Sequence, residues 1–175
     1  LDQKKGTFKY FEHKVDDRFS ISGNRIKRKG LVNDSNGLGL WIATNVGLNF
    51  FEFKTSKFIN YRNATGSAVF TDHDVSALHL SKAGLLWMLD DVTNDLLGFK
   101  DVSDGILQRI SLNGLVADAY GGNTFETSEH ELWYSSESYE TVRIQYFGQT
   151  KITRIQHDNA NPATIIGDWI SCAWE

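Results

Sequence analysis

The residues that could support acid–base or metal chemistry are scattered along this chain. Adjacent residues of an extended segment point in alternate directions, so neither Asp72-His73-Asp74 nor Asp90-Asp91 forms a converging set of ligands or an acid–base pair. No two histidines have metal-ligand spacing; they are His13, His73, His79, His130 and His157. We therefore predict no metal site, no cofactor and no catalytic residue, and we expect the chain not to be an enzyme.

Phosphate-binding and nucleophile motifs are also missing from the sequence. Gly37-Leu-Gly39 lacks the third glycine and the following helix of a phosphate loop, and no Gly-x-Ser-x-Gly motif occurs. The formal net charge of −4 argues against a nucleic-acid surface, which requires a concentrated basic patch. The one basic cluster (Arg25, Lys27, Arg28 and Lys29) is short, and we interpret it as a solvated strand edge.

A repeat indicates the elements that would position any site. Trp41, Trp87 and Trp133 are spaced 46 residues apart, and each follows a leucine in a short apolar run. A fixed period of this size is typical of an array of similar structural units. Each unit contains four short segments rich in β-branched and aromatic residues, separated by turn residues such as Asp34-Ser-Asn-Gly37 and Ser81-Lys-Ala-Gly84.

Four strands within one period match the size of a β-propeller blade, which is about 40 to 50 residues. We predict an all-β fold of three complete four-stranded blades plus a partial blade, as a fragment of a larger propeller. At the ends, Lys5–Phe11 matches the last strand of a unit and Gly167–Trp174 matches the first. The predicted boundaries are 1–18 for the end of a blade, 19–64, 65–112 and 113–158 for three blades, and 159–175 for the start of the next.

The repeated tryptophans have a structural interpretation. One sheet cannot cover both of its faces, so neighbouring blades pack face to face, and a large aromatic side chain on each second strand fills the gap. We assign Trp41, Trp87 and Trp133 to this core. The alternative is a stacking platform for a sugar or a base.

Several segments resemble the two-component regulator propeller repeat. The first unit contains the Asp-x-x-Gly turn, a Leu-Trp-Ile-x-Thr strand and the following Gly-Leu pair of that family. The matching segments are Asp34–Gly37, Leu40–Thr44, Gly47–Leu48, Phe51–Phe53, Thr55–Tyr61, Ile21–Ile26, His157–Pro162 and Ile166–Ile170. The second and third units depart from the pattern, since Met88-Leu-Asp-Asp91 replaces Ile-Gly-Thr and Asn123–His130 replaces the Asp-x-x-Gly turn.

This resemblance implies a function and a location. Proteins of this family are large bacterial membrane sensors, whose propellers lie outside the inner membrane and whose output domain is a histidine kinase or a GGDEF-type diguanylate cyclase. The chain would then be a non-catalytic, periplasmic ligand-sensing segment of a membrane-anchored parent. Propellers also host polysaccharide lyases, glycosidases and protein-interaction scaffolds, and these remain alternatives.

Loops between the second and third strands ring one end of a propeller and are the places where we expect a ligand to bind. Equivalent positions in the three units are Asn45, Asp91 and Glu137, and a small ligand such as a sugar or peptide would contact them. Three exposed turn residues without function are the alternative. We also expect self-association through open blade edges, or a closed ring of about four blades.

Overall fold

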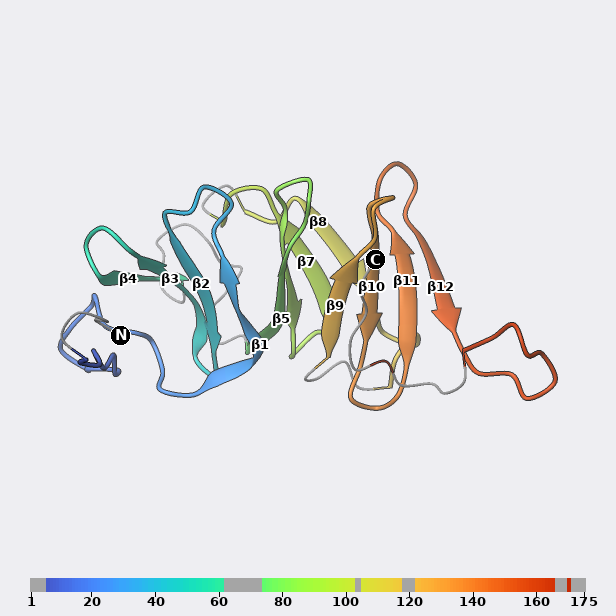
Figure 1. Ribbon diagram of the computed structural model, residues 1–175, viewed down its shortest axis with the longest axis horizontal. Coiled ribbons are helices and arrows are strands. Elements are labelled where there is room, and N and C mark those ends of the chain that lie inside the picture. The colour runs from blue at the N-terminus through green and yellow to red at the C-terminus, as the bar shows by residue number, and fades with distance from the viewer. Residues whose placement is uncertain (1–5, 62–73, 103–104, 118–121, 166–169, 171–175) are drawn as a thin grey trace.

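The computed structural model describes residues 6–61, 74–102, 105–117, 122–165 and 170. Over these residues the fold is all-β, with three four-stranded antiparallel sheets standing side by side (Figure 1). The first and third sheets lie at opposite ends of the row, so the described part is an open arc. Within it, no helix has the length and apolar character needed to span a membrane.

Each sheet is a simple meander of consecutive strands, and we refer to the sheets as the first, second and third blades. The first blade consists of β1 (Ile26–Asn33), β2 (Gly39–Thr44), β3 (Gly47–Glu52) and β4 (Lys57–Asn60). The second consists of β5 (Val75–Leu80), β6 (Leu86–Asp90), β7 (Asp95–Phe99) and β8 (Gln108–Ser111). The third consists of β9 (Asn123–Glu126), β10 (Glu131–Ser135), β11 (Thr141–Gln145) and β12 (Lys151–Ile155). The predicted fold class is therefore confirmed.

The first strands of the blades are neighbours in space, with β1 against β5 and β5 against β9. Both β1 and β5 contain a register shift and one residue in the left-handed region, Lys29 and Ala77, each at φ 50°. Such a bulge bends its strand and increases the local twist. In β1 the next residue is Gly30, where a Cβ would lie 2.6 Å from the Lys27 carbonyl oxygen, so the bend requires glycine there.

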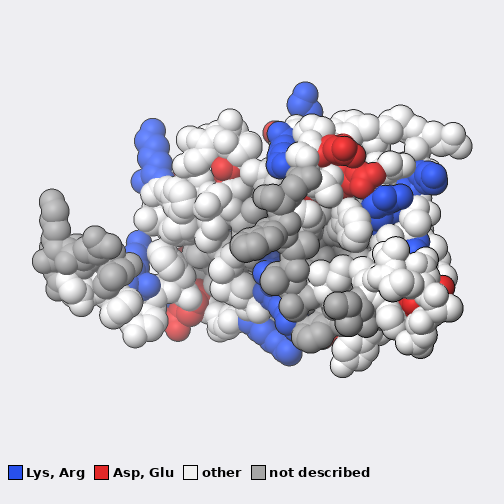
Figure 2. Space-filling model, turned by 45° about the vertical axis from the view of Figure 1, so that its right-hand side comes forward, with Lys and Arg blue, Asp and Glu red and all other residues white. Residues whose placement is uncertain are grey.

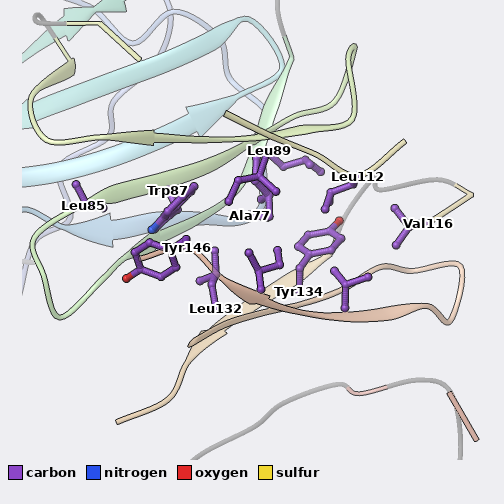
Figure 3. Close-up of a cluster of buried hydrophobic side chains, with 13 residues drawn as sticks. Ala77, Leu85, Trp87, Leu89, Leu112, Val116, Leu132, Tyr134 and Tyr146 are labelled. Carbon is purple, nitrogen blue, oxygen red and sulfur yellow. The ribbon is translucent and has the colours of Figure 1, made fainter. Parts of the chain in front are cut away.

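The interface between the second and third blades is the largest apolar cluster (Figure 3). Trp87 of β6 is fully buried, and its ring packs edge-on against Tyr146 at a centroid distance of 5.0 Å. Leu132 and Tyr134 of β10 point into the same cluster from the third blade. Gly98 of β7 is the residue paired with Trp87 on the neighbouring strand. A Cβ at Gly98 would lie 3.0 Å from the indole ring, so glycine leaves the space that the ring occupies.

The other two repeated tryptophans occupy equivalent strands with different burial. Trp41 is half-buried and packs against the apolar cluster between the first and second blades, beside Phe50 and Tyr61. Trp133 is also half-buried. It alternates with Leu132 and Tyr134 along β10, so its side chain lies on the face of the third blade turned away from the second.

The segment before β1 differs from the strand expected over Lys5–Phe11. Residues 6–25 include no strand among the described elements. Phe11 instead packs edge-on against Phe51 and Phe58, at 4.8 and 5.5 Å, and so covers part of the outer face of the first blade. This packing removes part of the Phe11 ring from water, which favours the observed position of the segment. The strand expected over Gly167–Trp174 lies outside the described residues, apart from Ile170.

The difference in burial between Trp87 and Trp133 predicts different losses of folding stability when each is replaced by alanine. Trp87→Ala should lower the free energy of unfolding by about 3–5 kcal/mol, because the cavity is enclosed by two blades. Trp133→Ala removes the same atoms from a half-buried position and should cost clearly less. Urea unfolding of both variants measures the difference, and equal losses would contradict the assigned interface.

Candidate functional site

The three candidate turn residues lie at one end of the arc. Because β2 runs antiparallel to β1, the β2–β3 turn returns to the end at which β1 begins, and the same holds in the other blades. Figure 1 shows the β2–β3 and β10–β11 turns at the lower edge of the molecule. Asn45 and Glu137 are exposed in these turns, whereas the side chain of Asp91 is only 4% exposed.

Lys27 of β1 is the centre of the charged groups at this end. Its side chain is only 6% exposed, and its Nζ lies 2.7 Å from Asp74 Oδ2 and 3.1 Å from Asp91 Oδ2. Asp74 immediately precedes β5, and Asp91 immediately follows β6, so both carboxylates come from the second blade or its edge. The interpretation of the basic cluster as a solvated strand edge is therefore wrong for Lys27, because the second blade packs against β1 and covers this residue.

Asp91 is oriented by two partners. Ser76 Oγ of β5 donates a hydrogen bond of 2.6 Å to Asp91 Oδ1, while Lys27 lies on the side of Oδ2. Burial raises the pKa of Asp91, and the hydrogen bonds from Ser76 and Lys27 offset part of that rise. Burial alone would lower the pKa of Lys27, but its hydrogen bonds to Asp74 and Asp91 raise that pKa above the ordinary value. Lys27 is therefore held as a paired cation and has no free lone pair for chemistry.

The neighbouring Asp90 has a different role from Asp91. Its Oδ1 accepts the backbone N–H groups of Val92 and Thr93, at 3.0 and 3.3 Å, and so stabilises the β6–β7 turn. The two adjacent carboxylates thus face separate partners, as strand alternation predicts.

Arg28 and Glu137 connect the first blade to the third. The Arg28 guanidinium donates a hydrogen bond to the Glu137 carboxylate, joining β1 of the first blade to the β10–β11 turn of the third. Both side chains remain accessible, at 57% and 43% exposed. In the first blade, the backbone N–H of Asn45 donates to the Arg25 carbonyl oxygen at 3.0 Å. All three candidate turns are therefore in contact with residues 25–28.

We call Lys27, Arg28, Asp74, Asp91 and Glu137 the Lys27 cluster. Its buried members are already paired, whereas Arg28 and Glu137 can exchange partners with a solute. Figure 2 shows Lys and Arg side chains gathered in the lower middle of the face it presents, at the height at which β1 begins in Figure 1. A guanidinium beside a carboxylate can bind carboxylate, hydroxyl or amide groups of a polar ligand.

Metal binding finds no support at this site. No group of three or more histidine, cysteine, aspartate or glutamate side chains is arranged to hold a metal within the part of the chain that the structure describes. Asp74 pairs with Lys27, and the other members of the Asp72-His73-Asp74 cluster lie outside the described residues.

Ligand binding at Asn45, Asp91 and Glu137 stays a prediction, and the residues that connect these three turns lie elsewhere in the sequence. Lys27, Arg28, Ser76 and Asp74 were not identified as site residues, because their partners are far away along the chain. The one available signal was the basic cluster itself, which begins immediately before an inner strand.

The fold is similar to that of known propellers. No protein-family model and no curated protein sequence matches the chain. Among solved structures, an extracellular domain from B. thetaiotaomicron, described as that of the hybrid two-component system BT3049, aligns over 94% of this chain with 12% identity and a TM-score of 0.65. The corresponding domain of BT4673 from the same organism aligns over 83%, with 17% identity and a TM-score of 0.63.

Virginiamycin B lyase from Staphylococcus aureus aligns over 75% of the chain, with 16% identity and a TM-score of 0.53. This chain spans 21% and 20% of the two sensor chains and 42% of the lyase chain. At these identities the likeness shows the fold: the chain consists of propeller blades like those of two-component sensor extracellular domains.

The Lys27 cluster predicts a large difference between two neighbouring cations. Lys27→Met leaves the buried carboxylate of Asp91 without its cation. This change should lower the free energy of unfolding at pH 7 by about 3–5 kcal/mol. The loss should shrink near pH 4, because without Lys27 the already raised pKa of Asp91 rises further and the folded protein can protonate that carboxyl. Urea unfolding at both pH values measures this.

Arg28→Met is the matched control. Its ion pair is exposed to solvent, so its loss should cost about 1 kcal/mol or less. Equal losses for the two variants, or a loss for Lys27→Met that is the same at pH 4 and pH 7, would contradict the assigned pairing.

Proposed function

We propose that this chain is a non-catalytic, ligand-sensing segment of a propeller in the signal-input region of a bacterial two-component or diguanylate-cyclase sensor. One observation carries the proposal: charged side chains from three successive blades meet in the Lys27 cluster at the turn end of the inner strands. A ligand bound there would contact every blade of the segment at once. Binding at such a point can change the arrangement of the blades, which is what an input module must do.

The two layers of the cluster suggest how sensing would work. Lys27, Asp74 and Asp91 are held by the packing of the first blade on the second and form a rigid base. Arg28 and Glu137 form an exposed pair, and such pairs contribute only about 0–1 kcal/mol. A ligand that takes over one of them would therefore release the first blade from the third at little cost.

The ligand class follows from the groups available. Arg28 donates up to five N–H groups and Glu137 only accepts, so the pair suits a solute with both carboxylate or carbonyl acceptors and hydroxyl or amide donors. Sugars and peptides both have these groups, and we propose a small ligand of this kind.

The location is proposed from the comparisons. The two sensor structures are extracellular domains, and this chain has their fold. We place it outside the cytoplasm, in the periplasm, as part of a parent anchored in the bacterial inner membrane with a histidine kinase or GGDEF-type output domain. Reading the parent gene beyond this chain tests the output domain directly.

The lyase neighbour keeps an enzymatic function as the second candidate. Fold likeness to virginiamycin B lyase does not fix function, because catalysis depends on the residues of a site. The cations and carboxylates of the Lys27 cluster are paired with one another, which favours binding over proton transfer. Incubation of the chain with virginiamycin B and with a panel of polysaccharides, followed by mass spectrometry, distinguishes the two, and a product would favour the enzyme.

We also propose self-association through the open blades. The outer face of the third blade presents the half-buried Trp133, and β12 leaves one edge without a partner strand among the described residues. Light scattering between about 1 and 100 μM should show a mass that rises with concentration. A constant monomer mass over this range would contradict the proposal.

Ligand binding predicts a thermal shift. The chain is screened against oligosaccharide and peptide panels. A ligand present at a concentration of about 100 times its Kd should stabilise the folded state by about 2.7 kcal/mol, which raises Tm by roughly 5–10 °C. Arg28→Met and Glu137→Gln should remove most of this shift, because they delete the exchangeable pair.

Arg109→Gln is the control for the screen, since Arg109 is about as exposed as Arg28, at 51%, and also pairs with a carboxylate, that of the buried Asp95 on the outer strands of the second blade. It should leave the shift unchanged. A binder whose shift is unaffected by Arg28→Met and Glu137→Gln would move the site away from the Lys27 cluster.

A further inference from the structure

A second polar cluster lies at the opposite end of the inner strands. Glu126 is the last residue of β9, and its side chain is only 2% exposed. Its Oε2 accepts the backbone N–H of Lys82 at 2.6 Å, and its Oε1 accepts the Tyr146 hydroxyl at 2.8 Å. A buried carboxylate needs such donors, because burial without them strongly disfavours its charge.

Two imidazoles complete this Glu126 cluster (Glu126, His79, Lys82, His130 and Tyr146). His130 Nδ1 is 3.3 Å from Glu126 Oε1, and His79 Nε2 is 3.7 Å from Oε2. The second distance is too long for a hydrogen bond, and His79 Nε2 is a buried nitrogen without a hydrogen-bond partner in the described structure. His130 is 44% exposed and lines a hollow of about 330 Å³ together with Tyr146 and Phe147, so solvent reaches the cluster.

The contacts of Glu126 cross from one blade to the next. His79 belongs to β5 and Lys82 to the β5–β6 turn of the second blade, while His130 and Tyr146 belong to the third. Tyr146 also packs against Trp87 in the apolar interface, as Figure 3 shows. The carboxylate is therefore bonded to the same ring that closes the interface between these blades.

We propose that the Glu126 cluster is a proton-sensitive joint between the second and third blades, closed when His79 is neutral and loosened when His79 takes up a proton. In the closed joint, a proton on His79 Nε2 would be buried at a position where the nearest acceptor, Glu126 Oε2, already accepts from Lys82 at short distance. Opening exposes the imidazole to water, where the cation is fully hydrated. The titratable groups that face His79 are Glu126 from β9, and through it His130 and Tyr146.

The electrostatics of the cluster agree with this direction. Burial lowers the pKa of His79, and the Glu126 carboxylate offsets part of that change. Burial would raise the pKa of Glu126, but the Lys82 N–H, Tyr146 and His130 hydrogen bonds lower it overall. Burial and the neighbouring carboxylate raise the pKa of Tyr146 to about 12.

The pH windows follow from these directions. The unfolded chain protonates His79 near its ordinary pKa of 6.5, whereas the folded chain does so only at lower pH, so stability falls as pH drops below about 6.5. Glu126 contributes to folding stability above its ordinary pKa of 4.5, and this contribution is lost as the pH falls further. Between pH 7 and 5, the lowered pKa of His79 is therefore expected to destabilise the joint.

Imidazole titration by NMR on the full chain tests the joint. His79 should titrate below its ordinary pKa, and in Glu126→Gln its pKa should fall further, by about one unit, because the stabilising negative charge is gone. Tyr146→Phe is the second variant, for use if Glu126→Gln does not fold. It keeps the Glu126 carboxylate and the aromatic ring at position 146, and removes only the hydroxyl. In that variant Glu126 loses a donor, so the His79 pKa should rise toward its ordinary value. A His79 pKa at or above the ordinary value in the wild type would overturn the proposal.

Amide hydrogen exchange locates the response. From pH 7 to 5, after correction for intrinsic rates, β5 and β9 should lose protection by about tenfold or more, while β2 and β3 change little. His79→Gln should abolish this difference, and His157→Gln, an exposed histidine after β12, should retain it. A wild type and a His79→Gln variant with the same pH response would exclude His79 as the sensor.

Discussion

The burial of aromatic side chains between adjacent blades is the interaction on which the structure depends. A four-stranded sheet has two faces and can cover neither alone, so each blade is stable only against its neighbours. Trp87 satisfies this constraint between the second and third blades, where Gly98 leaves space for the indole and Tyr146 closes its edge. The positions of the inner strands, and of everything attached to their ends, follow from this packing.

Polar groups are placed at the two ends of the inner strands, each between different blades. The Lys27 cluster lies where the inner strands begin, and the Glu126 cluster lies where they end. Both join one blade to the next, and both place a charged side chain under cover that only the neighbouring blade provides. Charges buried in this way stabilise the assembly only while their partners remain in place, so blade packing and ion pairing depend on each other.

The two ends differ in what can reach them. At the Lys27 cluster the exposed pair of Arg28 and Glu137 is open to a solute, which suits ligand binding. At the Glu126 cluster the carboxylate is enclosed and mainly a proton can alter its surroundings, through His79. On these proposals, a ligand would act on the contacts of the first blade with its neighbours, and acidity would act on the contact between the second and third blades.

Local patterns in the sequence were sufficient to predict the blades, and long-range packing was needed for the site. The 46-residue tryptophan period and the turns at Asp34–Gly37 and Ser81–Gly84 depend on neighbouring residues, so the repeat and its strands could be read directly. The repeat also predicted that Asn45, Asp91 and Glu137 lie at one end, because they occupy equivalent loops between second and third strands. The burial of Lys27 could not be predicted, because a neighbouring blade, not the adjacent sequence, removes it from water and supplies Asp74 and Asp91. Charge and spacing are properties of the chain, whereas burial and the identity of a distant partner arise only when the blades pack together.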